Sequence, residues 1–200
     1  MPGASQRILL VRHGRSAHVQ RGSIDLAGFH RWRDAYEAAG IDQQDQPHPA
    51  VTELAAGSGI VVASTAPRAL QSAMRLWPAR DVVTSPLLRE LELIPPNIRG
   101  VRMPLMAWAL TYGLQWILRA VFRRPHLAPA ELQRAREAAE WLSDLADEHG
   151  TVLAVTHASF RSLLARQLKS GGWQCEPSDR RHWSVWSFTR RKIRLKSSRD

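Results

Sequence analysis

The chain has 200 residues, of which 44% are hydrophobic, so it is long enough to bury the core of a single domain spanning residues 1–200. Its formal net charge is +10, and eight of its basic residues lie between positions 180 and 200. No nucleic-acid-binding motif accompanies them, so we interpret this segment as a solvated basic surface and expect no nucleic-acid partner. The single cysteine, Cys175, excludes an internal disulfide, and residues 1–6 lack a signal-peptide pattern, so we expect a cytoplasmic location.

The first elements in the chain alternate apolar runs with amphipathic segments. Residues 7–12 predict a buried strand, and residues 26–39 predict a helix with its aromatic side chains at helical spacing. Residues 41–50 contain two prolines and predict a loop. Residues 59–64 predict a second strand, followed by a helix capped by Ser64 or Thr65, with Pro67 in its first turn. The residues expected to face inward on that helix are Leu70, Ala73, Met74 and Trp77.

The second half of the chain continues the alternation after a less regular stretch. A short strand is predicted at residues 82–84, and residues 86–128 follow no clear periodicity. Residues 129–149 predict the clearest helix, which Gly150 closes. Further strands are predicted at residues 151–156, 184–189 and 192–195, with a helix at residues 158–170. This pattern predicts an α/β fold whose largely parallel sheet is covered by helices on both faces.

Basic and imidazole side chains follow three of the predicted strands. Arg12 and His13 come at the end of the first strand, Arg68 follows the second, and His157 follows the strand at 151–156. Ligands of open α/β sheets bind outside the carboxyl ends of the strands, so we expect these four side chains to meet there. Two guanidinium groups and two imidazoles make a pocket suited to a phosphoryl group.

Three segments around these residues resemble the motifs of one family. Residues 10–16, Leu-Val-Arg-His-Gly-Arg-Ser, resemble the RHG signature of the histidine phosphatase superfamily, also called phosphoglycerate mutase-like. Residues 64–73 resemble its second motif and residues 155–161 its last, and the three stand in the family's order. The resemblance implies a three-layer α/β/α domain whose mixed sheet includes one antiparallel strand. It also implies phosphatase activity on a small phosphorylated substrate.

The same resemblance implies roles for single residues. His13 would attack phosphorus in its neutral form, with a backbone carbonyl in the Gly14 turn fixing its tautomer. Arg12 and Arg68 would clamp the phosphoryl oxygens, and His157 would bond to the same oxygens as an imidazolium.

Two further residues of these motifs have alternative interpretations. Ser16 either donates to the phosphate or caps a helix, and the two roles are compatible. Arg161 follows His157 by four residues, and we expect it to make a structural ion pair rather than to contact substrate.

A carboxylic acid must protonate the leaving oxygen. The segment Leu88-Arg89-Glu90 resembles the family's L-x-E pattern, so Glu90 is the candidate acid. Glu92 is equally suitable by chemistry alone, and the alternative for Glu90 itself is a solvated acid at a helix start. The chain lacks the family's G-x-W-E-G segment and has Val19 where many members have Asn, which favours hydrolysis over mutase activity.

The function is therefore predicted to be metal-independent phosphate monoester hydrolysis without a cofactor. Two alternatives stay open: removal of phosphate from protein phosphohistidine, and a non-catalytic protein that binds a phosphorylated ligand or a membrane. The intact set of candidate residues argues against a loss of catalysis. The sequence leaves the oligomeric state open.

An apolar insert around residues 95–128 separates the candidate acid from the last motif. Residues 103–118 carry no charge, include Trp108, Tyr112 and Trp116, and are followed by Arg119, Arg123 and Arg124. The run is shorter than the roughly 20 apolar residues of a membrane-spanning helix. It therefore predicts a cap that contacts the leaving group, an interfacial helix at an anionic membrane, or a dimer surface.

Overall fold

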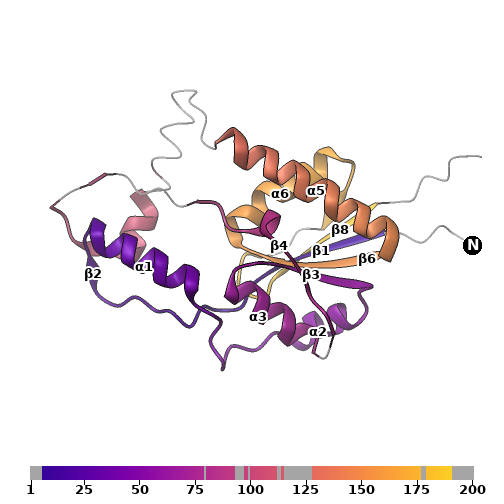
Figure 1. Ribbon diagram of the computed structural model, residues 1–200, viewed down its shortest axis with the longest axis horizontal. Coiled ribbons are helices and arrows are strands. Elements are labelled where there is room, and N and C mark those ends of the chain that lie inside the picture. Colours follow the sequence, from indigo (N-terminus) through magenta and orange to yellow (C-terminus); the bar gives the residue numbers. More distant parts are fainter. Residues whose placement is uncertain are drawn as a thin grey trace, which may run out of the picture.

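A six-stranded sheet lies at the centre of the molecule, with helices on both of its faces (Figure 1). The computed structural model describes residues 6–78, 80–92, 97–98, 100–111, 114, 128–176 and 179–190. The strands of this sheet, in spatial order, are β4 (Val83–Ser85), β3 (Ile60–Ser64), β6 (Thr151–Thr156), β1 (Gln6–Arg12), β8 (Val185–Arg190) and β7 (Gln174–Glu176). The helices are α1 (Leu26–Ala38), α2 (Pro49–Ala56), α3 (Pro67–Leu76), η1 (Pro86–Leu88, a 3-10 turn), α5 (Pro129–His149) and α6 (Ala158–Ser170).

The register of the central strands brings their carboxyl ends to one level. Strands β4, β3, β6 and β1 are mutually parallel, and β8 is antiparallel to both of its neighbours, β1 and β7. Arg12, the last residue of β1, pairs with Thr156, the last residue of β6. The next amide, that of His13, donates to the carbonyl oxygen of Thr156 at 3.0 Å. The predicted α/β fold, with one antiparallel strand among the described strands of its mixed sheet, is thus confirmed.

Alternation along the strands divides the core into two halves. Side chains of a strand point to opposite faces in turn, so Ile8 and Leu10 pack on one side of β1 and Leu9 and Val11 on the other. The first side is covered by α5 and α6, and the second by α2 and α3 (Figure 1). All four of these side chains are fully buried. The result is the expected three-layer α/β/α arrangement.

Helix α2 was not predicted, because the prolines of residues 41–50 were interpreted only as breakers. Pro49 instead occupies the first turn of α2, where the missing N–H has no intrahelical partner to lose. The imidazole of His48 caps this helix by accepting from the amide of Ala50. Val51 and Ala55 are buried, so the short helix contributes to the core under α3.

Helix α3 differs from the prediction in its start and in its buried face. Its N-cap is Ala66 rather than Ser64 or Thr65, while Pro67 does lie in the first turn. Met74 is exposed, and Arg68 and Ser72 occupy buried positions instead. The inward face of α3 is therefore partly polar. Strand β7 was not predicted, and the strand predicted at residues 192–195 lies outside the described residues.

The described part of the apolar insert packs against α1. Two-residue strands β2 (Ser23–Ile24) and β5 (Met103–Pro104) pair, and residues 105–111 are helical. Trp108 is buried, donates to the carbonyl oxygen of Ile24 at 3.0 Å, and lies 5.4 Å from the ring of Phe29 on α1. None of the helices built from described residues is long and apolar enough to cross a bilayer.

Candidate active site

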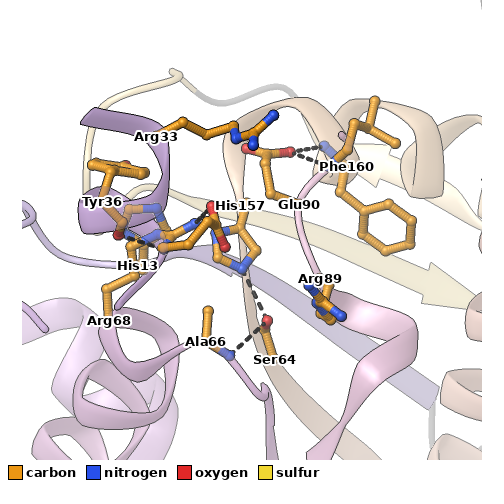
Figure 2. Close-up of polar contacts among 12 residues, drawn as sticks. His13, Arg33, Tyr36, Ser64, Ala66, Arg68, Arg89, Glu90, His157 and Phe160 are labelled. Carbon is orange, nitrogen blue, oxygen red and sulfur yellow. Dashed lines mark hydrogen bonds and ion pairs between the residues drawn. The ribbon is translucent and has the colours of Figure 1, made fainter. Parts of the chain in front are cut away.

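Three strand ends converge as predicted. His13 follows β1, His157 follows β6, and Arg68 lies in the first turn of α3, directly after β3. Because these three strands are adjacent and parallel, the residues after them share one edge of the sheet. The rings of His13 and His157 have centroids 5.0 Å apart and meet edge to face (Figure 2).

His13 is held as a neutral imidazole with a defined tautomer. Its Nδ1 lies 2.6 Å from the carbonyl oxygen of Gly14, which is the partner that the sequence predicted. A carbonyl oxygen only accepts, so Nδ1 carries the proton and Nε2 keeps its lone pair. Burial lowers the pKa of His13 to about 3, while the bond to Gly14 acts to raise it. The positive charge of Arg68 adds to the lowering.

His157 is buried beside His13, and Ser64 holds one of its ring nitrogens. Its Nε2 lies 2.9 Å from the hydroxyl of Ser64 at the end of β3. Burial, and then the neighbouring His13, hold the pKa of His157 well below its ordinary value. The imidazolium expected from the sequence stays a prediction for the complex with a phosphate dianion, whose charge would act in the opposite direction.

Three buried nitrogen atoms around His13 have no hydrogen-bond partner among the described residues. They are Nε of Arg12, Nε of Arg68 and Nδ1 of His157. An unsatisfied buried polar group costs about 1–3 kcal/mol, so such atoms are rare unless a ligand completes them. These three come from the ends of the three adjacent strands, and the guanidinium groups are cationic. The charges of both arginines are close enough to His13 to lower its pKa, so an anion bound there would be attracted by both.

Glu90 is hydrogen-bonded to the first turn of α6, whose N-cap residue is His157. Its Oε1 accepts from the amides of Leu91 at 3.0 Å and Phe160 at 2.9 Å, and its Oε2 accepts from the amide of Ser159 at 3.4 Å (Figure 2). The N-cap residue of α6, His157, provides no side-chain cap, so Glu90 performs that function from another part of the chain. Burial nevertheless raises the pKa of Glu90.

The structure also shows the surroundings of Ser16 and Arg161, the two motif residues with alternative interpretations. Ser16 is buried and accepts from the amide of His18 at 3.2 Å, but it begins no helix, since α1 is capped by Asp25. The helix-cap interpretation of Ser16 is therefore wrong, and its contact with phosphate stays a prediction. Arg161 has the structural role expected, but through different partners. It donates to the carbonyl oxygen and hydroxyl of Ser184 and stacks over Trp186, and it pairs with no carboxylate within the described part of the chain.

Residues 179–184 contact His13 and Gly14 and so form another side of the candidate site. This contact was not predicted from the sequence. His182 contacts the carbonyl oxygen of His13 through Nδ1 at 3.0 Å, and the two ring centroids are 5.5 Å apart. Trp183 packs against the Gly14 turn so closely that a Cβ on Gly14 would lie 2.4 Å from its ring. The segment precedes β8, and because β8 runs antiparallel to β1, it starts at the end of the sheet where β1 finishes. That topological rule was the signal that could have placed it here.

A cleft of about 650 Å³ is lined by α1, the segment after β4 and the start of α5. Tyr36, Glu90 and the exposed Glu92 line it, whereas the four residues at the strand ends, Arg12, His13, Arg68 and His157, do not. The other lining residues come from α1, the segment after β4 and the start of α5: Trp32, Arg33, Glu37, Pro86, Arg89, Leu91, Glu131 and Arg134. Trp108 is not among them, and the predicted cap over the leaving group stays a prediction. Tyr112 and Trp116 lie outside the described residues.

No group of three or more His, Cys, Asp or Glu side chains in the described residues is arranged to hold a metal ion.

Comparison with solved structures identifies the fold. A mycobacterial glucosyl-3-phosphoglycerate phosphatase superposes with a TM-score of 0.50 at 19% identity, over 80% of this chain and 78% of that one. A phosphoserine phosphatase of Entamoeba histolytica, solved with 3-phosphoglyceric acid, superposes with a TM-score of 0.54 at 13% identity, over 90% and 89% of the two chains. No protein-family model matches the sequence, and no curated protein is significantly similar to it. The chain thus has the fold of the phosphoglycerate mutase-like histidine phosphatases.

Proposed function

We propose that this protein is a phosphatase that hydrolyses phosphate monoesters through a phosphohistidine at His13. The observation that carries the proposal is the set of three unpartnered buried nitrogens, on Arg12, Arg68 and His157, beside the free lone pair of a neutral His13. A cationic, desolvated cradle next to a nucleophile is the arrangement that phosphoryl transfer requires. The two structural neighbours named above are phosphatases, but at 19% and 13% identity their likeness supports the fold alone.

The first half of the reaction transfers the phosphoryl group to the enzyme. The Nε2 lone pair of His13 attacks phosphorus while the bond between phosphorus and the leaving oxygen breaks, and its electron pair stays on that oxygen. Glu90 donates its proton to the oxygen, for which its raised pKa is suited. Arg12 and Arg68 supply the positive charge that metal ions provide in other phosphoryl-transfer sites.

The second half returns the enzyme to its starting state. Water attacks phosphorus, and the carboxylate of Glu90 takes the proton that water loses. The bond between phosphorus and Nε2 breaks, its electron pair returns to His13, and inorganic phosphate leaves. Glu90 is preferred over Glu92 for both steps because Glu90 is buried and is fixed to the helix that carries His157, whereas Glu92 is exposed.

Hydrolysis of p-nitrophenyl phosphate in the presence of EDTA tests the proposal. The wild-type protein should release nitrophenol, and His13→Ala should not. His149→Ala is the matched control, because His149 ends α5 at the opposite edge of the sheet and should leave the rate unchanged. Wild-type protein that is inactive on p-nitrophenyl phosphate and on a panel of phosphorylated metabolites would leave a non-catalytic ligand-binding role instead.

A further inference from the structure

The guanidinium of Arg68 is held by α1, a helix that precedes Arg68 by about 30 residues in the chain. Arg68 lies on α3 and is fully buried, yet its two terminal nitrogens bond to α1. Nη1 donates to the carbonyl oxygen of Tyr36 at 3.0 Å, and Nη2 donates to Oε1 of Glu37 at 2.8 Å. The guanidinium carbon also lies 4.4 Å from the centre of the Tyr36 ring (Figure 2). One edge of the guanidinium is therefore fixed by α1.

The third nitrogen of the same guanidinium, Nε, is not used by α1. Nε of Arg68 is buried and has no partner among the described residues, and the charge of Arg68 is close enough to lower the pKa of His13. A guanidinium has five N–H donors in a rigid plane, so fixing its terminal nitrogens also fixes the direction of Nε–H. The contact with α1 thus decides where the donor for a phosphoryl oxygen points.

Helix α1 is itself anchored by a row of aromatic rings that begins at Tyr36, the ring in contact with Arg68. The ring of Tyr36 stacks on that of Trp32, with centroids 5.3 Å apart, and Trp32 packs on Phe29 at 5.4 Å. Phe29 in turn contacts the buried Trp108. This row of rings limits how far α1 can shift and so makes Glu37 a fixed point for the guanidinium.

We propose that Glu37 is a positioning residue for phosphate binding, acting through Arg68; this rests on the phosphatase function proposed above. The ion pair between Glu37 and Arg68 holds the guanidinium with Nε–H directed at the phosphoryl group. The competing possibility is that Glu37 imitates the phosphate and must be displaced by it. The two possibilities predict opposite effects of removing the carboxylate, because a competitor weakens phosphate binding and a positioning group strengthens it.

The magnitudes favour positioning. Removing the negative charge of Glu37 would by itself attract a dianion, but that side chain is 44% exposed, so water and salt screen the effect. Releasing the guanidinium from its fixed orientation has the larger consequence, since a hydrogen bond to a charged group is worth roughly tenfold or more in affinity. Gln at position 37 would keep a hydrogen-bond acceptor for Nη2, whereas Ala would keep none.

The experiment compares Glu37→Gln and Glu37→Ala with the wild type, using Asp34→Asn as the control. Asp34 is an exposed carboxylate on the same helix that pairs only with Arg33 among the described residues. The inhibition constant of inorganic phosphate and the KM of p-nitrophenyl phosphate are measured at 0.05 and 0.5 M NaCl. We expect both constants to rise about threefold in Glu37→Gln and about tenfold in Glu37→Ala, and to stay unchanged in Asp34→Asn. The ratio between variant and wild type should persist at the higher salt concentration, because orientation is not screened.

The outcomes separate this inference from the proposed function. Active wild-type protein whose phosphate affinity is the same in all variants would overturn the positioning role alone. A lower inhibition constant in Glu37→Ala would overturn it in favour of competition. Loss of thermal stability without any change in the two constants would show that Glu37 supports only the fold, which also overturns it. Wild-type protein that neither hydrolyses p-nitrophenyl phosphate nor binds phosphate would overturn both proposals.

Discussion

Acid should destabilise the fold through His13, because this side chain is buried in its neutral form. The pKa of His13 is lowered to about 3 in the folded protein, against an ordinary value of 6.5, with burial as the main cause. A histidine whose folded pKa is depressed contributes its full stability above the unfolded pKa. That contribution is lost as the pH falls from about 6.5 towards about 3, since the unfolded chain then binds the proton and the folded chain does not.

The size of the effect follows from the shift. Each pH unit in that window changes the free energy of unfolding by about 1.36 kcal/mol per proton, so His13 should account for about 3 kcal/mol at pH 4. His157 acts in the same direction, because burial lowers its pKa as well. Urea unfolding followed by tryptophan fluorescence at pH 7 and pH 4 measures the change in wild type and in His13→Asn.

The comparison between the two proteins isolates the contribution of one side chain. Carboxylates and His157 titrate in both, so the wild type should lose about 3 kcal/mol more than His13→Asn between pH 7 and pH 4. Parallel losses in the two proteins would refute the reasoning, because they would mean that His13 takes up its proton in the folded state as readily as in the unfolded one. The neutral nucleophile of the proposed mechanism would then lose its physical basis.

Two other substitutions, Glu90→Gln and Gly14→Ala, test the proposed proton donor and the turn that follows β1. Glu90→Gln should lower turnover roughly 10²–10⁴-fold on an alkyl phosphate and much less on p-nitrophenyl phosphate, whereas Glu92→Gln should be mild on both; equal losses on the two substrates would exclude Glu90 as the donor. Because burial raises the pKa of Glu90, the acid form persists to higher pH, so the alkyl phosphate rate should fall as the pH rises through that pKa, and Glu90→Gln should remove this fall. Gly14→Ala should destabilise the protein by about 1–3 kcal/mol in thermal unfolding, since its Cβ would lie 2.4 Å from the Trp183 ring. In Gly57→Ala the new Cβ meets nothing closer than 3.6 Å, so similar losses in both alanine variants would contradict the close contact.

Elements whose identity depends on local patterning were predictable from the sequence. Helix α5 begins and ends where its pattern of buried Ala and Leu residues and the terminal Gly150 indicate, and Gly150 has the positive φ of 76° that favours glycine. Strands β1 and β6 followed from uninterrupted apolar runs, as expected for strands buried on both faces. Because parallel strands end at one edge of a sheet, His13 and His157 were expected there, whereas the direct pairing of β1 with β6 comes from the structure.

The rest of the site depends on contacts between residues far apart in the chain. The bond between Glu37 and Arg68 joins residues separated by 31 positions, and the bond between His182 and His13 joins residues separated by 169. Neither is encoded in a local spacing. The basic stretch beginning at Arg180 was interpreted as a solvated surface, yet the carbonyl oxygen of Arg180 accepts from Arg12 at 2.6 Å. Local composition described the charge of that segment but not its place beside the site.

The most direct test of the account is the identity of the phosphorylated atom. Rapid quenching of the wild type with ³²P-labelled p-nitrophenyl phosphate should trap an acid-labile, base-stable label on His13. Since Nδ1 of His13 donates to the Gly14 carbonyl oxygen, the label should reside on Nε2, which comparison with the two phosphohistidine isomers resolves. The label should be absent from His13→Ala and present in His149→Ala. A label on His157, on Nδ1 of His13, or retained in His13→Ala would contradict the account.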